Sequence, residues 1–118
     1  MNKEGKMGEL KKMTENRKFE GGRLLLSSGV SKTVAQEGGS KTFVKFIINS
    51  LDRHFSGDWG DMSADDKQEN EFSLDKYLRI FSAYIIPDRL DKGVAQEKIW
   101  IITEADRSAT TVLFPEEY

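Results

Sequence analysis

Four side chains of the kinds used in acid–base and phosphate chemistry are spread along the sequence: His54, Tyr84, Glu104 and Arg107. An imidazole with an ordinary pKa of about 6.5 can act as a general base near neutral pH. A guanidinium presents a planar fork that fits a phosphate or a carboxylate. If the four groups converge on one edge of a sheet, they would form the site of a small metal-independent ribonuclease or nucleotide-processing enzyme.

The same residues also have a purely structural interpretation, which we prefer. His54 falls in the last turn of a helical pattern, where the helix dipole favours a protonated imidazole and the ring can bond to the following turn. Arg107 can pair with Glu104 or Asp106 and so fix a hairpin turn. No Gly-x-Ser-x-Gly motif is present to supply a serine nucleophile. We therefore expect a protein that is not an enzyme, with the ribonuclease as the alternative.

A strongly acidic stretch covers residues 58–75, with seven acidic groups and Lys67 as its one base. Such a stretch forms either a solvated helix face or a docking face for a basic partner. The docking hypothesis assigns partner binding to Asp58, Trp59, Asp61, Asp65, Asp66 and Glu69. The partner it predicts is a basic protein or a nucleoprotein.

The turn within this stretch has the sequence Gly57-Asp58-Trp59-Gly60-Asp61, and its carboxylates suggest a calcium loop. The EF-hand spacing of oxygen ligands is not matched, because Trp59 and Gly60 occupy places that the pattern does not predict. We expect Trp59 instead to fill a gap between a helix and the sheet, with its indole N–H bonded to one partner. No metal site and no cofactor are predicted.

Hydrophobic spacing predicts one strand and three helices in the first two thirds of the chain. A short apolar run at 22–26 predicts a buried strand, and the segment 28–38 predicts a short helix. The strongest helical pattern covers 40–55, where apolar residues recur at intervals of four. A capping sequence predicts a third helix over 63–72.

Three further strands are predicted in the last third of the chain. Residues 79–86 alternate with a period of two and end at Pro87, and the segments 98–103 and 110–114 predict a hairpin. The free edge of 110–114 offers a third interpretation, a self-assembling structural protein or homodimer. The order predicts an α+β fold, with about three helices on one face of a small antiparallel sheet of three to four strands.

Composition limits the chain to one modest domain. It has 118 residues, of which 37% are hydrophobic and 32% are charged. We assign residues 1–18, which lack periodicity, to a mobile arm and 19–118 to a single α+β domain. The chain has no cysteine and a single histidine, which excludes disulfides, thiolate catalysis and cysteine-based metal sites.

The net charge and the hydropathy of the sequence argue against nucleic acid and membrane as direct partners. A net charge of −2 disfavours direct nucleic-acid binding through a basic surface. No apolar run approaches the roughly 20 residues of a membrane span, and the first residues do not form a secretory signal. We expect a cytoplasmic protein with no membrane partner.

Several blocks within residues 19–118 resemble a family of small bacterial proteins found on plasmids and other mobile elements. The residues that carry the resemblance are Phe19-Glu20-Gly21-Gly22-Arg23, Ser28-Gly29, Arg53-His54, Gly57 to Asp61, Asp66, Asn70, Arg79, Ser82-Ala83-Tyr84 and the block from Lys98 to Tyr118. Members of this family are commonly labelled plasmid-related protein or type I restriction endonuclease subunit M.

The second label implies adenine methylation, which the residues do not support. A methyltransferase needs a doubly wound domain and an Asn/Asp-Pro-Pro-aromatic segment, whereas Pro87 and Pro115 stand apart in a short chain. The mobile-element context implies a small acidic protein that blocks host defence. We therefore expect a non-enzymatic inhibitor of anti-CRISPR or anti-restriction type that acts through the acidic face at 58–75.

Overall fold

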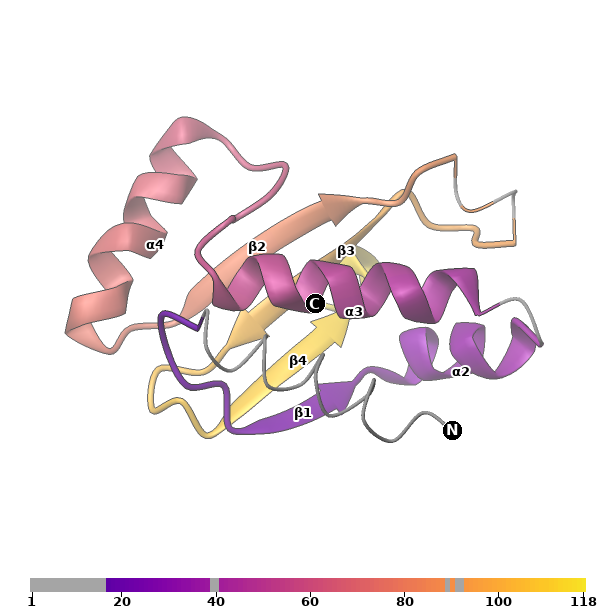
Figure 1. Cartoon of the computed structure of the whole chain (residues 1–118), viewed down its shortest axis with the longest axis horizontal. Coiled ribbons are helices and arrows are strands. Elements are labelled where there is room, and N and C mark those ends of the chain that lie inside the picture. The colour runs from indigo at the N-terminus through magenta and orange to yellow at the C-terminus, as the bar shows by residue number, and fades with distance from the viewer. Residues whose placement is uncertain (1–16, 39–40, 89, 91–92) are drawn as a thin grey trace, which may run out of the picture.

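The computed structural model describes residues 17–38, 41–88, 90 and 93–118, and Figure 1 shows their arrangement. Within these residues the elements are β1 (Arg23–Leu26), α2 (Ser28–Gln36), α3 (Thr42–Phe55), α4 (Ala64–Lys76), β2 (Ile80–Ile85), β3 (Lys98–Thr103), β4 (Ala109–Leu113) and η1 (Pro115–Glu117). The α+β class is confirmed. The predicted arm at 1–18 lies outside the described residues, apart from Arg17 and Lys18. No helix in the described part of the chain has the length and apolar character needed to cross a membrane.

The four strands form one mixed sheet in the order β1-β4-β3-β2. β3 pairs antiparallel with β4, as the predicted hairpin requires, and also with β2. β1 differs, because it pairs parallel with β4, with Leu24 opposite Thr110 and Leu26 opposite Val112. Parallel pairing needs a long connection, and the three helices between β1 and the hairpin supply one.

This topology corrects two expectations about the strands. Strand β4 lies between β1 and β3, so residues 110–114 do not offer the free edge predicted for self-assembly. Strand β1 lies at the margin of the sheet, and its leucines are exposed where a buried strand was expected. The exposed fractions are 55% for Leu24, 39% for Leu25 and 41% for Leu26.

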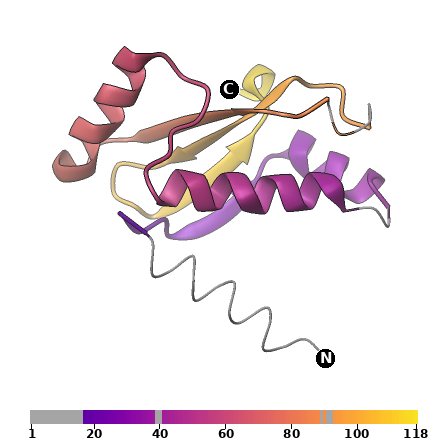
Figure 2. The same ribbon diagram turned by 45° about the horizontal axis from the view of Figure 1, so that its top comes forward.

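Helix α3 crosses one face of the sheet (Figures 1 and 2). It contributes several residues to the hydrophobic core. Its apolar stripe buries Phe43, Ile47 and Leu51, which recur at intervals of four and therefore share one side of the helix. These side chains belong to the same cluster as Ile101 of β3 and Val112 of β4. The predicted helix is confirmed, and its packing fixes which face of the sheet is covered.

Helix α4 has a different character, because only Asn70 and Ser73 of its residues are buried. It begins as predicted, with the hydroxyl of Ser63 accepting from the N–H of Asp66 at 3.1 Å, but it continues to Lys76 instead of ending near residue 72. A helix that is polar on nearly all sides cannot be held by an apolar stripe. Specific polar contacts must therefore hold it.

Asn70 makes the contact that holds α4 beside the outer edge of β2. Its Oδ1 accepts from the N–H of Phe81 at 3.1 Å, and its Nδ2 donates to the carbonyl of the same residue. One amide side chain thus takes the place of a neighbouring strand at that position. Unpaired groups on an edge strand invite pairing with other chains, and this contact removes them.

We expect Asn70→Ala to lower the free energy of unfolding by about 2 to 3 kcal/mol, because it leaves both backbone groups of Phe81 unpaired in a partly buried place. Urea denaturation followed by circular dichroism measures the change. Gln68→Ala, exposed on the same helix, is the control and should stay within about 0.5 kcal/mol of the parent. Equal stability of the two variants would contradict the role given to Asn70.

Candidate functional site

His54 is fully buried at the end of α3, and its ring joins this helix to the sheet. Its Nδ1 lies 2.5 Å from Oγ of Ser82 on β2, and its Nε2 lies 2.9 Å from Oγ1 of Thr103 on β3. From Thr103 a further hydrogen bond of 2.8 Å leads to Oγ1 of Thr110, whose hydroxyl donates to the carbonyl of Gly21. Buried polar groups stabilise a fold only when they are paired, and each side chain here has a partner.

The donor and acceptor in each of these hydrogen bonds follow from the last group in the series, the carbonyl of Gly21. The carbonyl of Gly21 can only accept, so the single proton of Thr110 is directed to it. Thr103 must then donate to Thr110, and the imidazole must donate to Thr103 through Nε2. A neutral ring with its proton on Nε2 accepts from Ser82 at Nδ1. The contacts therefore assign one neutral tautomer to His54.

Burial, and to a smaller extent the positive charge of Arg107, lowers the pKa of His54 from 6.5 to about 3. The expectation of a protonated ring bonded to the following turn is wrong on both counts. The helix dipole favours a charge at the exposed end of a helix, whereas this ring is fully buried and bonded to Ser82 and Thr103 of the sheet. The sequence does carry the signal, because Ile47, Leu51 and His54 follow a spacing of four and three along one face.

Arg107 ties the hairpin turn to the end of α4. The residue has a positive φ of 62°, and its guanidinium donates to the carbonyls of Leu78 at 2.6 Å, Ser73 at 3.0 Å and Glu104 at 3.2 Å. Two of these carbonyls lie at or just beyond the C-terminal end of α4, where a cation is favoured. Arg107 thus holds two elements together and is only 8% exposed.

The expected pairing of Arg107 with a carboxylate of its own turn is wrong. The Glu104 carboxylate instead lies 3.4 Å from Nε of Arg79, and Asp106 accepts from the N–H of Ser108 at 3.0 Å. The hairpin turn is still fixed by Arg107, as predicted, but through main-chain carbonyls.

Tyr84, the fourth residue of the ribonuclease alternative, is also fully buried. Its hydroxyl donates to the carbonyl of Asp58 at 2.7 Å, and burial raises its pKa. His54 and Arg107 are buried as well, while Glu104 lies near the surface with Arg79. The structure does not present these four groups together to a substrate.

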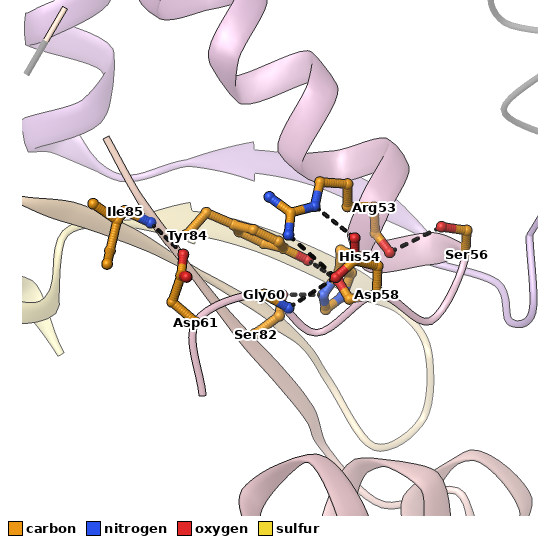
Figure 3. Close-up of polar contacts among 9 residues, drawn as sticks. All are labelled: Arg53, His54, Ser56, Asp58, Gly60, Asp61, Ser82, Tyr84 and Ile85. Carbon is orange, nitrogen blue, oxygen red and sulfur yellow. Dashed lines mark hydrogen bonds and ion pairs between the residues drawn. The ribbon is translucent and has the colours of Figure 1, made fainter. Parts of the chain in front are cut away.

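The turn before α4 lies against the outer edge of β2, as Figure 3 shows. Gly60 forms a parallel bridge with Ala83, whose N–H donates to the carbonyl of Trp59 and whose carbonyl accepts from the N–H of Asp61 at 2.7 Å. A Cβ at Gly60 would lie 2.1 Å from the carbonyl of Ala83, and φ there is +78°, so only glycine fits. The Asp61 carboxylate then accepts from the N–H of Ile85 at 2.9 Å.

Asp58 fixes this turn to α3. Its carboxylate accepts from Nε of Arg53 at 2.7 Å and from Nη2 at 3.2 Å, a two-point contact (Figure 3). It also accepts from the N–H of Gly60, and the hydrogen bond from Arg53 is the main reason that its pKa is lowered. The carboxylates of Asp58 and Asp61 are therefore both used within the protein.

Trp59 is buried, with 3% of its surface exposed, and its ring packs near those of Phe19 and His54. Its indole N–H donates to Oε2 of Glu71 at 2.7 Å, and its ring centre lies 6.0 Å from that of His54. The prediction that it fills a gap and needs one hydrogen-bond partner is confirmed. Its assignment to a partner-binding surface is wrong, since it is covered by the protein itself.

Asp65, Asp66 and Glu69 remain from the predicted partner-binding set. All three are exposed on α4, and none forms an ion pair with another residue of the described ranges. Asp58 and Asp61 are exposed as well, but their carboxylates are hydrogen-bonded within the protein, which leaves these three of the six predicted residues without an internal partner for their carboxylates among the described residues. Within the same ranges, no group of three or more metal-ligating side chains is gathered in one place.

Comparison with known proteins gives no match to a family model, to a curated protein or to a solved structure. The function must therefore be argued from this chain's own residues and contacts.

The buried imidazole predicts a specific loss of stability in acid. The pKa of His54 is about 3 in the folded protein, against 6.5 for an ordinary imidazole in the unfolded chain. The stabilisation by the neutral ring is therefore complete above pH 6.5. This contribution falls by about 1.4 kcal/mol per pH unit as the pH drops from 6.5 towards 3. We expect His54→Gln to be less stable at neutral pH but to have a flatter pH dependence over this range.

Urea denaturation of the parent and of His54→Gln at several pH values measures the difference in slope. The carboxylates contribute equally to both proteins, so the difference isolates the imidazole. Parallel pH profiles for the two proteins would contradict a buried, neutral His54.

Proposed function

We propose that the protein is a non-enzymatic binding protein that docks on a basic partner protein through the outer surface of α4. The observation that carries the proposal is the division of carboxylates in the acidic stretch. Those of Asp65, Asp66 and Glu69 are exposed without an ion pair in the described ranges. The carboxylates that bond within the molecule are those of Asp58, Asp61 and Glu71. The seventh acidic residue of the stretch, Asp75, is exposed in the last turn of α4.

The spacing of these free carboxylates has an energetic cost that a partner would relieve. Asp65 and Glu69 are four residues apart on α4, which places them side by side on the helix surface. Like charges in this arrangement destabilise a helix by a few tenths of a kcal/mol. A Lys or Arg from a partner would convert this repulsion into attraction, with a dependence on salt.

The state of the reactive side chains supports a function without catalysis. His54 and Tyr84 are buried and hydrogen-bonded within the protein, and the guanidinium of Arg107 donates to main-chain carbonyls. A general base or a phosphate-binding cation must reach its substrate within hydrogen-bond distance. None of these three groups does so in the folded protein.

The charge of the surface favours a protein partner over a nucleic acid. Phosphates are repelled by exposed carboxylates and attracted by basic surfaces. Surfaces that bind nucleic acid are themselves basic, so an acidic helix is suited to cover one. Together with the resemblance to small mobile-element proteins, this argument narrows the proposed partner to a nucleic-acid-binding component of a bacterial defence system.

The test compares a triple amide variant, Asp65→Asn, Asp66→Asn and Glu69→Gln, with a control that changes Glu20→Gln, Asp52→Asn and Asp88→Asn. Both variants lose the same charge, but only the first changes the surface of α4. We expect the α4 variant to bind the partner protein captured by the parent about tenfold more weakly, since exposed ion pairs contribute roughly 0.2 to 1 kcal/mol each. The control should bind like the parent.

Affinity capture from a bacterial lysate, with protein and nucleic acid scored separately, identifies the partner, and titration at two salt concentrations gives the affinities. In cells, the parent but not the α4 variant should raise the transformation efficiency of a plasmid targeted by the host's defence. Equal behaviour of parent and α4 variant in both assays would show that the surface is only solvated.

A further inference from the structure

The outer edge of β1 carries free backbone groups. The N–H of Arg23 donates to the carbonyl of Ser108 and that of Ser27 to Val112, each at 2.9 Å, so odd-numbered residues face β4. In an extended strand the backbone groups of Leu24 and Leu26 then face away from the sheet. No residue of the described ranges pairs with them.

The opposite edge of the same sheet is treated differently. Along β2, both backbone groups of Phe81 are hydrogen-bonded to Asn70, and both of Ala83 are hydrogen-bonded to the turn around Gly60. The N–H of Ile85 donates to Asp61. Proteins usually protect a sheet edge with such covers, with charged residues or with proline. Among the residues that the structure describes, none covers β1 in this way, Arg23 at its start is its one charged residue, and its three consecutive leucines are exposed.

We propose that β1 pairs antiparallel with β1 of a second copy of this chain, across a two-fold axis that passes Leu25. Leu24 then lies opposite Leu26 of the second copy, and the reverse pair forms on the other side of the axis. Each pair exchanges two backbone hydrogen bonds, because the outward groups of both residues face each other. The two four-stranded sheets join into one continuous sheet with six leucines at the junction.

Charge complementarity selects a second copy in this register. Antiparallel pairing about Leu25 places Arg23 opposite Ser27 of the second copy, in a pair whose side chains lie close together. The hydroxyl of Ser27 donates to Oε1 of Glu117 at 2.6 Å, so this carboxylate stands beside the junction. Arg23 has no ion pair within the described ranges. The two-fold axis thus brings each Arg23 to a Glu117, whereas parallel pairing would bring the two Arg23 residues together.

This interface is separate from the surface proposed to bind a basic partner. Helix α4 lies beside β2, and β1 is at the other margin of the sheet (Figure 1). A dimer built through β1 therefore leaves both copies of α4 exposed, and it would present two acidic surfaces on one particle.

Cysteine cross-linking tests the register directly, because the chain has no cysteine of its own. Leu25 meets its own copy in a pair without backbone hydrogen bonds, where the Cα atoms are about 4.5 Å apart, a separation that a disulfide can span. We expect Leu25→Cys to form a covalent dimer under mild oxidation. Ile48→Cys, exposed to 49% on α3, is the control and should stay monomeric. Equal cross-linking of the two variants would overturn the proposal.

Light scattering after size exclusion tests the association itself. The parent should have twice the chain mass of 13.4 kDa, and Leu24→Lys with Leu26→Lys should reduce it to the mass of one chain without changing the circular dichroism spectrum. Arg23→Glu should raise the dimer dissociation constant about tenfold, and Lys32→Glu on α2 should not. A parent that is monomeric at every concentration, or a dimer that survives the double lysine change, would contradict pairing through β1.

Discussion

The backbone groups at the outer edge of β2 must be paired, and much of the structure between α3 and β2 serves this need. Asn70, Gly60 and Asp61 supply partners for the outward groups of the strand. Each contact then requires its own support. The turn at Gly60 is held by Asp58 against α3, and the polar helix that carries Asn70 is held at its end by Arg107. The acidic stretch is therefore first a cover for a sheet edge.

The same stretch has an outer side that the fold does not use. The carboxylates of Asp58 and Asp61 are hydrogen-bonded within the protein, and Trp59 is buried. Asp65, Asp66 and Glu69, in contrast, are exposed on a helix that buries only Asn70 and Ser73. Attaching a helix through a few polar contacts leaves most of its circumference free for charge. This division explains how one segment can stabilise the sheet and also offer a docking surface.

The sequence predicted what depends on local spacing and missed what depends on distant contacts. The stripe that includes Phe43 and Ile47 identified α3, the alternation over 79–86 identified β2, and β-branched and aromatic residues identified β3 and β4. The pairing of β1 with β4 joins residues more than 80 positions apart, which no local pattern encodes. Arg107 was recognised as important, but its carbonyl partners Ser73 in α4 and Leu78 just beyond it depend on tertiary structure. Trp59 illustrates both cases, since its packing was predicted and its burial excluded the surface role assigned to it.

Amide hydrogen exchange by nuclear magnetic resonance tests the central claim that the segment before β2 closes its outer edge. The amides of Phe81, Ala83 and Ile85 face away from β3, so on their own sheet they would be open to water. The account predicts that they exchange as slowly as those of Ser82 and Tyr84, which face β3. Exchange of the three outward amides at the rate of an unprotected edge strand would contradict it.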